Sequence, residues 1–146
     1  MDVPLKKRLQ EDLKEARKAR EKLRTLVLST TLSELRNREI EIGGEADDQE
    51  TVSVIAKAVK RRNEAAEQMR AGGREELAER ETREAEILSR YMPEGLSEDE
   101  VREIVRSILS KGPRELGPVM GQLMPRIQGR FDGREANRIV REELAG

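Results

Sequence analysis

The fold is decided by residues 116–133, which read Leu-Gly-Pro-Val-Met-Gly-Gln-Leu-Met-Pro-Arg-Ile-Gln-Gly-Arg-Phe-Asp-Gly. The apolar residues of this stretch are spaced as on one face of an α-helix. They are Val119, Met120, Leu123, Met124 and Ile127. Pro118 suits the first turn of that helix, and Pro125 is expected to kink or end it. Gly121 costs about 1 kcal/mol relative to Ala inside a helix, so we expect another backbone to pass close to it.

The sequence on either side predicts a helix before this stretch and a last helix after it. Ser97 and Glu100 match a capping box, which predicts the start of a helix with one apolar face. Gly112-Pro113 is expected to end this helix. Asp132 is the expected N-cap of a helix over residues 133–144, with Glu135 completing a second capping box. The expected buried face of this last helix consists of Ala136, Ile139, Val140 and Leu144. The C-terminal part of the chain therefore reads as three short helices.

The beginning of the chain predicts either one long helix or two shorter ones. Asp2 or Val3 is expected to cap the first helix, with Pro4 in its first turn. The apolar spacing then runs through residues 5–40 without a clear phase break. Periodicity alone therefore allows one helix over residues 4–42, which is very long for a small domain.

Two further helices follow before a linker at residues 92–96. Gly43-Gly44 ends the preceding helix, and Asp47 or Asp48 is expected to cap the third. Gly72-Gly73 is expected to join the third and fourth helices in a tight hairpin. The apolar residues expected on the buried face of the fourth helix are Leu77, Ile87, Leu88 and Tyr91.

Composition supports an all-α fold with a thin aliphatic core. Charged residues make up 40% of the chain, hydrophobic residues 35% and aromatic residues 1%. The apolar residues compensate for their low number by their strict helical spacing. We expect a four-helix N-terminal region, residues 1–92, followed by a small three-helix C-terminal subdomain, residues 93–146. The sequence has no apolar run long enough to span a membrane and no signal-peptide core, so a cytoplasmic location is expected.

Residue types restrict the chemistry. The chain has no Cys and no His, and its net charge is −1. It contains no phosphate-loop motif, and the acidic loop at residues 45–50 lacks calcium-binding spacing. Ser29-Thr30-Thr31 is interpreted as small side chains packed at a helix crossing in preference to a nucleophile. We therefore predict no catalytic residue, no metal site and no cofactor.

Several motifs together resemble the YqeY-like family (GatB/YqeY domain). They are Val119-Met120-Gly121-Gln122-Leu123-Met124-Pro125, Gly129-Arg130-Phe131-Asp132-Gly133 and Asn137-Arg138-Ile139-Val140. The resemblance extends to residues 74–78 and 91–97 and so covers nearly the whole chain. It implies a helix break near Ala19-Arg20-Glu21.

The same region is similar to the tail domain of the B subunit of glutamine-dependent tRNA amidotransferase. The shared pattern is Gly121-Gln122, Met124 and the basic loop before the last helix. In that subunit the tail is understood as a helical module that contacts tRNA. The resemblance therefore implies a GatB-tail-like domain over residues 93–146, with tRNA as a partner and aminoacyl-tRNA or amidotransferase machinery as a further one.

Basic residues are concentrated where this resemblance lies. Residues 111–141 carry seven basic and three acidic side chains, a net charge of +4. The candidate nucleic-acid-binding residues are Lys111, Arg114, Arg126, Arg130, Arg134, Arg138 and Arg141. They are either a solvated face or a footprint for RNA phosphates. With so few aromatics to stack bases, any RNA binding should depend on phosphate contacts and weaken with salt.

Two other basic patches have the same two interpretations, a solvated face or a wider RNA surface. The first comprises Lys6, Lys7, Arg8, Lys14, Arg17, Lys18 and Arg20. The second comprises Lys57, Lys60, Arg61 and Arg62.

Three functions remain open at this point. The first is a non-catalytic tRNA-binding accessory module. The second, implied by the family resemblance, is a carbon–nitrogen ligase with glutamine as amido donor, although the catalytic parts of the larger subunit have no counterpart in this sequence. The third is a helical protein–protein adaptor that uses Met120 and Met124 around Gly121.

Overall fold

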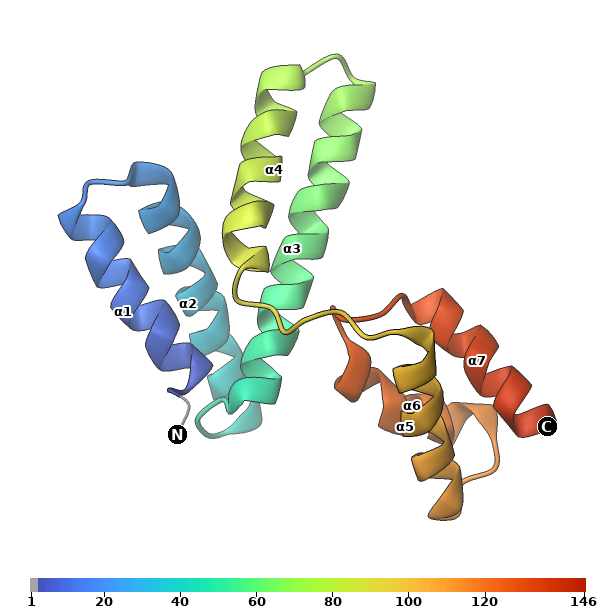
Figure 1. Cartoon of the computed structure of the whole chain (residues 1–146). Coiled ribbons are helices and arrows are strands. Elements are labelled where there is room, and N and C mark those ends of the chain that lie inside the picture. The colour runs from blue at the N-terminus through green and yellow to red at the C-terminus, as the bar shows by residue number, and fades with distance from the viewer. Residues whose placement is uncertain (1–2) are drawn as a thin grey trace. The chain divides into compact units, whose positions relative to one another are not determined.

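A computed structural model describes residues 3–146, and every regular element within them is an α-helix (Figure 1). The prediction of an all-α fold is therefore confirmed over the described residues. The helices are α1 (Leu5–Lys18), α2 (Lys22–Ile42), α3 (Asp48–Ala71), α4 (Glu75–Ser89), α5 (Glu98–Ser110), α6 (Leu116–Ile127) and α7 (Gly133–Ala145). They form two compact units: unit 1 ends at Met92 and contains α1–α4, and unit 2 begins at Pro93 and contains α5–α7.

A tight turn separates α1 from α2, so the single helix that periodicity allowed is wrong and the break implied by the resemblance is confirmed. The Arg20 N–H donates to the Arg17 carbonyl at 3.2 Å, and the Glu21 N–H donates to the Ala16 carbonyl at 3.0 Å. This pair of bonds is the Schellman ending of a helix. Arg20 adopts the left-handed φ of 57° that this ending requires.

The start of α3 caps two helices at once. Asp47 is the N-cap of α3, and its side chain accepts the Glu50 N–H at 2.8 Å. Asp48 reaches back to accept the Leu5 N–H at 2.8 Å, at the first residue of α1. The N-cap position of α1 is Pro4, so neither Val3 as cap nor Pro4 inside the first turn is correct, because α1 begins one residue later than expected. Asp2 lies outside the described residues.

The core of unit 1 is built where α1, α2, α3 and α4 meet. Its buried members are Leu5, Leu9, Leu13, Val27, Leu28, Ile55, Ala58, Leu88 and Tyr91. The expectation that Leu77 is buried is wrong: its side chain is 46% exposed, while the neighbouring Ala78 is fully buried. At this end of α4 the buried position is occupied by Ala78, whose small side chain allows α3 and α4 to approach closely.

Tyr91 connects the end of α4 to α1. Its hydroxyl donates to the Asp12 carboxylate, and the Arg8 guanidinium lies 5.5 Å from the centre of its ring. Burial, together with the bond to Asp12, raises the pKa of Tyr91 to about 12. The only tyrosine of the chain is therefore a neutral packing residue of unit 1 at physiological pH.

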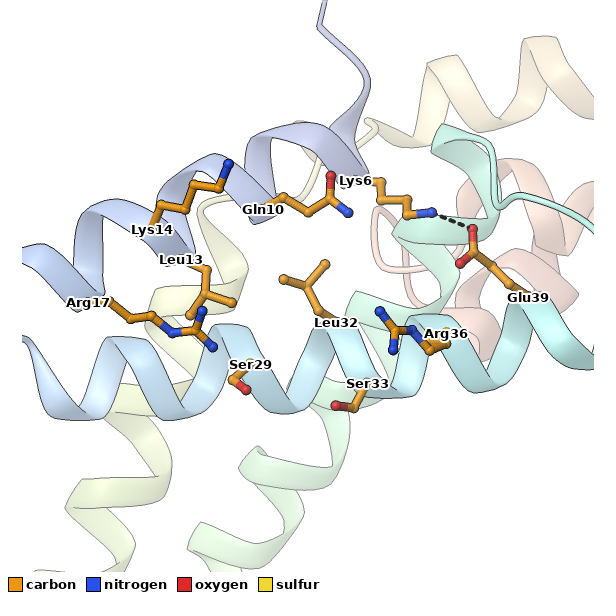
Figure 2. Close-up of a pocket in the computed structure, with 10 residues that line it drawn as sticks. All are labelled: Lys6, Gln10, Leu13, Lys14, Arg17, Ser29, Leu32, Ser33, Arg36 and Glu39. Carbon is orange, nitrogen blue, oxygen red and sulfur yellow. Dashed lines mark hydrogen bonds and ion pairs between the residues drawn. The ribbon is translucent and has the colours of Figure 1, made fainter.

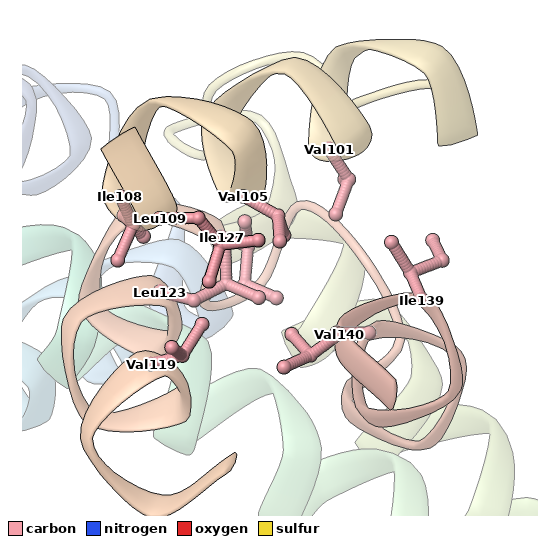
Figure 3. Packing of buried hydrophobic residues seen from close by; sticks show 10 residues of the cluster. Val101, Val105, Ile108, Leu109, Val119, Leu123, Ile127, Ile139 and Val140 are labelled. Carbon is pink, nitrogen blue, oxygen red and sulfur yellow. The ribbon is translucent and has the colours of Figure 1, made fainter. Parts of the chain in front are cut away.

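Unit 2 is a three-helix cluster with its own core, in which apolar side chains from α5, α6 and α7 converge (Figure 3). The largest buried members are Val101, Val105, Ile108, Leu109, Val119, Leu123, Ile127, Ile139 and Val140. The capping box of Ser97 and Glu100 is confirmed at the start of α5. At the start of α7, Asp132 is the N-cap and accepts the Glu135 N–H at 3.1 Å. The Glu135 carboxylate instead bonds Arg138, so the second capping box is only half formed.

Two expectations for α6 are corrected or refined. A Cβ added at Gly121 would meet nothing within 4 Å, so no backbone passes close to this glycine and that expectation is wrong. Gly121 faces open space on an exposed helix surface. Pro125 lies inside α6, which ends shortly afterwards at Ile127.

Candidate nucleic-acid interface

The seven predicted RNA-contacting residues all lie in unit 2, distributed over two loops and two helices. Lys111 and Arg114 lie between α5 and α6, and Arg126 is in the last turn of α6. Arg130 lies in the loop before α7, and the other three are on α7. These three are Arg134, Arg138 and Arg141. Arg130 is half-buried, and the remaining six are exposed.

Arg138 is already surrounded by carboxylates. Its guanidinium lies 2.6 Å from Glu98 on α5, and 2.8 and 2.9 Å from Glu135 and Glu142 on its own helix. These bonds, that to Glu135 first, raise the pKa of the Arg138 guanidinium further above its usual value. Because its charge is compensated and its N–H groups are used, Arg138 ties α7 to α5 and is poorly placed to receive a phosphate.

The same carboxylates join a wider ion-pair network between α5 and α7. Arg102 lies 2.5 Å from Glu142 and 3.0 Å from Glu143, and Arg106 lies 2.5 Å from Glu143. Arg106 is the main cause of the lowered pKa of Glu143, and Arg102 of that of Glu142. Arg138 is the main cause of the lowered pKa of Glu98. With four carboxylates and three guanidiniums, this side of unit 2 has no excess positive charge for RNA.

Sequence reasoning missed this network. Arg102 and Arg106 are spaced four apart on α5, and the acidic pair Glu142-Glu143 comes 40 residues later. A search for charge spacing within one helix cannot find such pairs, because the partners meet only after α5 and α7 pack together.

Arg130 and Arg141 keep their charge although they make hydrogen bonds. The Arg130 Nε donates to the Glu94 carbonyl at 2.9 Å, and the Arg130 carbonyl accepts the Leu96 N–H at 2.8 Å. Arg130 thus anchors the loop before α7 to the segment that leads into α5. The Arg141 Nε donates to the Asn137 side-chain oxygen at 2.7 Å. Both acceptors are neutral, so neither bond cancels the positive charge. Arg130 does lie close enough to Glu100 to contribute, after Ser97, to the lowered pKa of that carboxyl.

Four cations remain without any side-chain hydrogen bond or ion pair to the described residues. They are Lys111, Arg114, Arg126 and Arg134. The structure does not gather them into one cluster: Arg114 precedes α6 and Arg126 is near its end, and the part of the helix between them, from Leu116 to Arg126, is roughly 15 Å long. Such a spread suits several separate phosphates of a polyanion better than one small anion. The start of α7 adds little, because the carboxylate of Asp132 caps it.

The basic patch on α3 is much smaller than the sequence suggests. Arg61 lies 2.7 Å from Glu34 on α2, and Arg62 is buried beside Glu84 of α4 at 3.5 Å. Only Lys57 and Lys60 of this patch stay exposed and unpaired among the described residues. The interpretation of Arg62 as part of a solvated or RNA-facing surface is therefore wrong, since its side chain packs between α3 and α4.

Over residues 3–146, no group of three or more His, Cys, Asp or Glu side chains has an arrangement that could hold a metal ion. No helix within the same residues is both long enough and apolar enough to cross a membrane. Thr31 is buried and its hydroxyl donates to the Val27 carbonyl at 2.8 Å, which uses it for packing within α2.

Comparison with known proteins identifies the family. The family model described as Yqey-like protein matches residues 6–144. The chain is similar to "Altered inheritance of mitochondria protein 41, mitochondrial" from Pyrenophora tritici-repentis, with 32% identity over 128 residues, 84% of this chain and 71% of the relative. The protein of the same name from Clavispora lusitaniae is 33% identical over 106 residues, 70% of this chain and 61% of the relative. That from Candida glabrata is 30% identical over 88 residues, 59% of this chain and 48% of the relative.

The chain thus spans about half to seven tenths of the length of these relatives. The family match nevertheless runs through both units, from α1 to α7. It covers the motifs around Gly121 and Asp132 on which the resemblance rested. On this evidence the chain belongs to the YqeY-like family.

Proposed function

We propose that this protein is a non-catalytic accessory module that binds tRNA through phosphate contacts made by unit 2, a domain similar to the tail of the amidotransferase B subunit. The observation that supports this most directly is the set of exposed cations without carboxylate partners, Lys111, Arg114, Arg126 and Arg134. Phosphate oxygens supply the negative charge that these side chains lack within the described residues, and Arg and Lys are the usual donors to them. Arg130 and Arg141 add further positive charge to unit 2, whereas Arg138 is assigned to the contact between α5 and α7.

The choice of tRNA among RNAs rests on the resemblance to the amidotransferase tail. The chemistry itself predicts backbone binding without base readout, because the chain contains one Tyr, one Phe and no Trp. Partnership with aminoacyl-tRNA or amidotransferase machinery belongs to the same proposal. The cytoplasmic location stays a prediction, and the relatives carry the word mitochondrial in their names.

The test is a titration of the purified protein with bulk tRNA at several salt concentrations. In a unit 2 variant, Arg114→Gln, Arg126→Gln and Arg134→Gln are combined. We expect wild-type binding to weaken steeply with salt, and the variant to bind about tenfold or more weakly at moderate salt with a shallower salt dependence. A matched control combines Lys7→Gln, Lys57→Gln and Lys60→Gln, which removes the same charge from exposed side chains of unit 1. An equal loss of affinity in this control would mean that overall charge is the cause, and would reject the assignment of binding to unit 2.

Arg138→Gln provides a second comparison within unit 2. Because this guanidinium is bonded to three carboxylates, its loss should lower stability but leave the salt dependence of RNA binding nearly unchanged. Absence of tRNA binding by the wild-type protein at low salt would reject the proposed function. A ligase would instead release ammonia from glutamine without a partner, and an adaptor would retain protein partners after nuclease treatment.

A further inference from the structure

Unit 1 contains a groove between α1 and α2. This groove is separate from the RNA-binding surface proposed for unit 2. The groove has a volume of about 530 Å³, and Leu13 and Leu32 lie between the two helices (Figure 2). In this view Arg17 extends from α1 towards α2, and Arg36 extends from α2 towards α1. Apolar contacts thus hold the two helices together beneath a lining of polar and charged groups.

The lining comes from one regular stripe on each helix. On α1 the polar members are spaced by four, four and three residues, and on α2 by four, three and three, so each stripe follows one helical face. The stripes consist of Lys6, Gln10, Lys14 and Arg17 on α1, and of Ser29, Ser33, Arg36 and Glu39 on α2. The α1 stripe extends roughly 16 Å along the helix axis. The groove is therefore elongated.

Most of this lining has no partner within the chain. Glu39, the carboxylate of the groove, lies 2.8 Å from the Lys6 Nζ and also accepts the Ala46 N–H at 2.8 Å, so it is used at one end. Lys14, Arg17 and Arg36 make no side-chain hydrogen bond or ion pair to any described residue, and the same holds for the hydroxyls of Ser29 and Ser33. Lys14 and Arg17 are thus uncompensated cations, whereas Arg36 is partly balanced by Glu39, whose pKa its charge helps to lower. These three cations share the groove with two free hydroxyl groups.

This set of groups suits phosphate esters. Arg, Lys, Ser and Gln side chains are the usual donors to the oxygens of a nucleic-acid backbone. Neither Tyr91 nor Phe131, the aromatic residues of the chain, lines the groove, so a base has nothing to stack on. An elongated cationic groove without a base pocket fits a run of phosphodiesters better than a single nucleotide.

We propose that the α1–α2 groove is a second phosphate-binding site, which holds a segment of RNA backbone on Lys14, Arg17 and Arg36 with help from the hydroxyls of Ser29 and Ser33. The inference rests on the proposed RNA-binding function and adds unit 1 to it. Unit 1 and unit 2 then each carry phosphate contacts of their own.

The experiment compares a groove variant, Lys14→Gln, Arg17→Gln and Arg36→Gln combined, with the unit 2 variant and with the Lys7, Lys57 and Lys60 control. We expect the groove variant to bind tRNA about tenfold or more weakly at moderate salt, and the slope of log affinity against log salt to become shallower by about two to three. Circular dichroism and thermal melting verify that each variant is folded. Lysine acetylation footprinting of the wild-type chain should show Lys14 protected by tRNA and Lys7 unprotected.

The outcomes separate the two proposals. If the groove variant keeps wild-type affinity and slope while the unit 2 variant loses them, the groove inference is overturned and the proposed function stands. If only the groove variant loses binding, the groove is supported and the assignment to unit 2 is wrong. Protection of Lys14 by polyglutamate but not by tRNA would assign the groove to an acidic protein segment and overturn the inference. A wild-type chain that binds no tRNA overturns both.

Discussion

Arg20 occupies a position at the end of α1 where glycine is usual, so no local signal in the sequence marks the end of the helix there. Helices α1 and α3 end with the same pair of backbone hydrogen bonds. In α1 the N–H groups of Arg20 and Glu21 donate to the carbonyls of Arg17 and Ala16. In α3 the N–H groups of Gly73 and Arg74 donate to the carbonyls of Arg70 and Met69 in the same way. Both residues have left-handed φ values, 57° for Arg20 and 76° for Gly73. Gly adopts this conformation without steric cost, whereas a side chain with a Cβ is strained there.

Replacing Arg20 by Gly should therefore stabilise the protein. We expect Arg20→Gly to raise the free energy of unfolding by about 1 kcal/mol, because it removes the strain of a left-handed non-glycine residue. Urea denaturation followed by circular dichroism measures the change. Gly73→Ala is the control in the opposite direction: it places a Cβ on a residue with left-handed φ and should lower the free energy of unfolding by a similar amount. A less stable Arg20→Gly protein would mean that the Arg20 side chain contributes more than its backbone costs.

At the scale of elements, the α3–α4 hairpin contains a buried ion pair. Arg62 and Glu84 are 8% and 9% exposed, and their closest atoms, Nε and Oε1, are 3.5 Å apart. Arg62 also donates to the Ala58 carbonyl at 3.0 Å, and Arg80 lies 3.9 Å from the Glu84 carboxylate. Glu84 is thus buried between the two helices, although most of its charged neighbours on α4 are exposed. Removing Glu84 would leave Arg62 as a buried, unpaired charge, whereas Glu84 keeps Arg80 nearby if Arg62 is removed.

Glu84→Ala should therefore be strongly destabilising, by about 3 kcal/mol, because it strands the Arg62 guanidinium between the two helices. The double variant Arg62→Met with Glu84→Leu should recover most of this loss, since apolar side chains of similar size fill the same space without a charge. Denaturation curves of the wild-type protein, the Glu84→Ala variant and the double variant provide the comparison. If the double variant is as unstable as Glu84→Ala, packing and not the stranded charge is the cause.

At the scale of the whole molecule, the two units differ in their dependence on ionised carboxylates. The pKa values of Glu98, Glu100, Glu142 and Glu143 in unit 2 are lowered, mainly by the Arg network and, for Glu100, by the capping bonds to Ser97. In unit 1 the lowered carboxyl pKa is that of Glu39, through its bond to Lys6. A carboxyl group whose pKa is lower in the folded protein stabilises the fold when it is ionised, and this stabilisation is fully present above the ordinary pKa, which is 4.5 for Glu. The stabilisation is lost as the pH falls through the lower pKa of the folded state.

Unit 2 should accordingly lose stability before unit 1 when the pH is reduced below about 4.5. Backbone amide NMR spectra recorded from pH 6 to pH 2.5 would report each unit separately. Signals of α5 and α7 should broaden or shift to unfolded positions at a higher pH than those of α3 and α4. Arg138→Gln should weaken this pH dependence, because Glu98 loses the main cause of its lowered pKa. Simultaneous unfolding of both units in the wild-type chain would contradict the prediction.

Local sequence rules predicted elements whose determinants are close in the chain. The Ser97–Glu100 box, the Asp47 and Asp132 caps and the ending of α3 at Gly72-Gly73 each depend on residues within one or two helical turns. The α1–α2 break lacked such a signal, because Arg20 stands where glycine is usual, and only the family resemblance placed it. The cap on Leu5 comes from Asp48, 43 residues away, and no local rule finds it.

By itself, then, the amino-acid sequence determined the all-α class, the helix faces and the places where most helices begin and end, because periodicity and capping act over a few residues. Tertiary structure alone decided which charges are free. Arg138 and Glu98 lie 40 residues apart and Arg62 and Glu84 lie 22 apart, so their pairing requires the helices to be packed. The groove of Lys14, Arg17 and Arg36 likewise exists only where α1 and α2 lie side by side, because each helix contributes one wall.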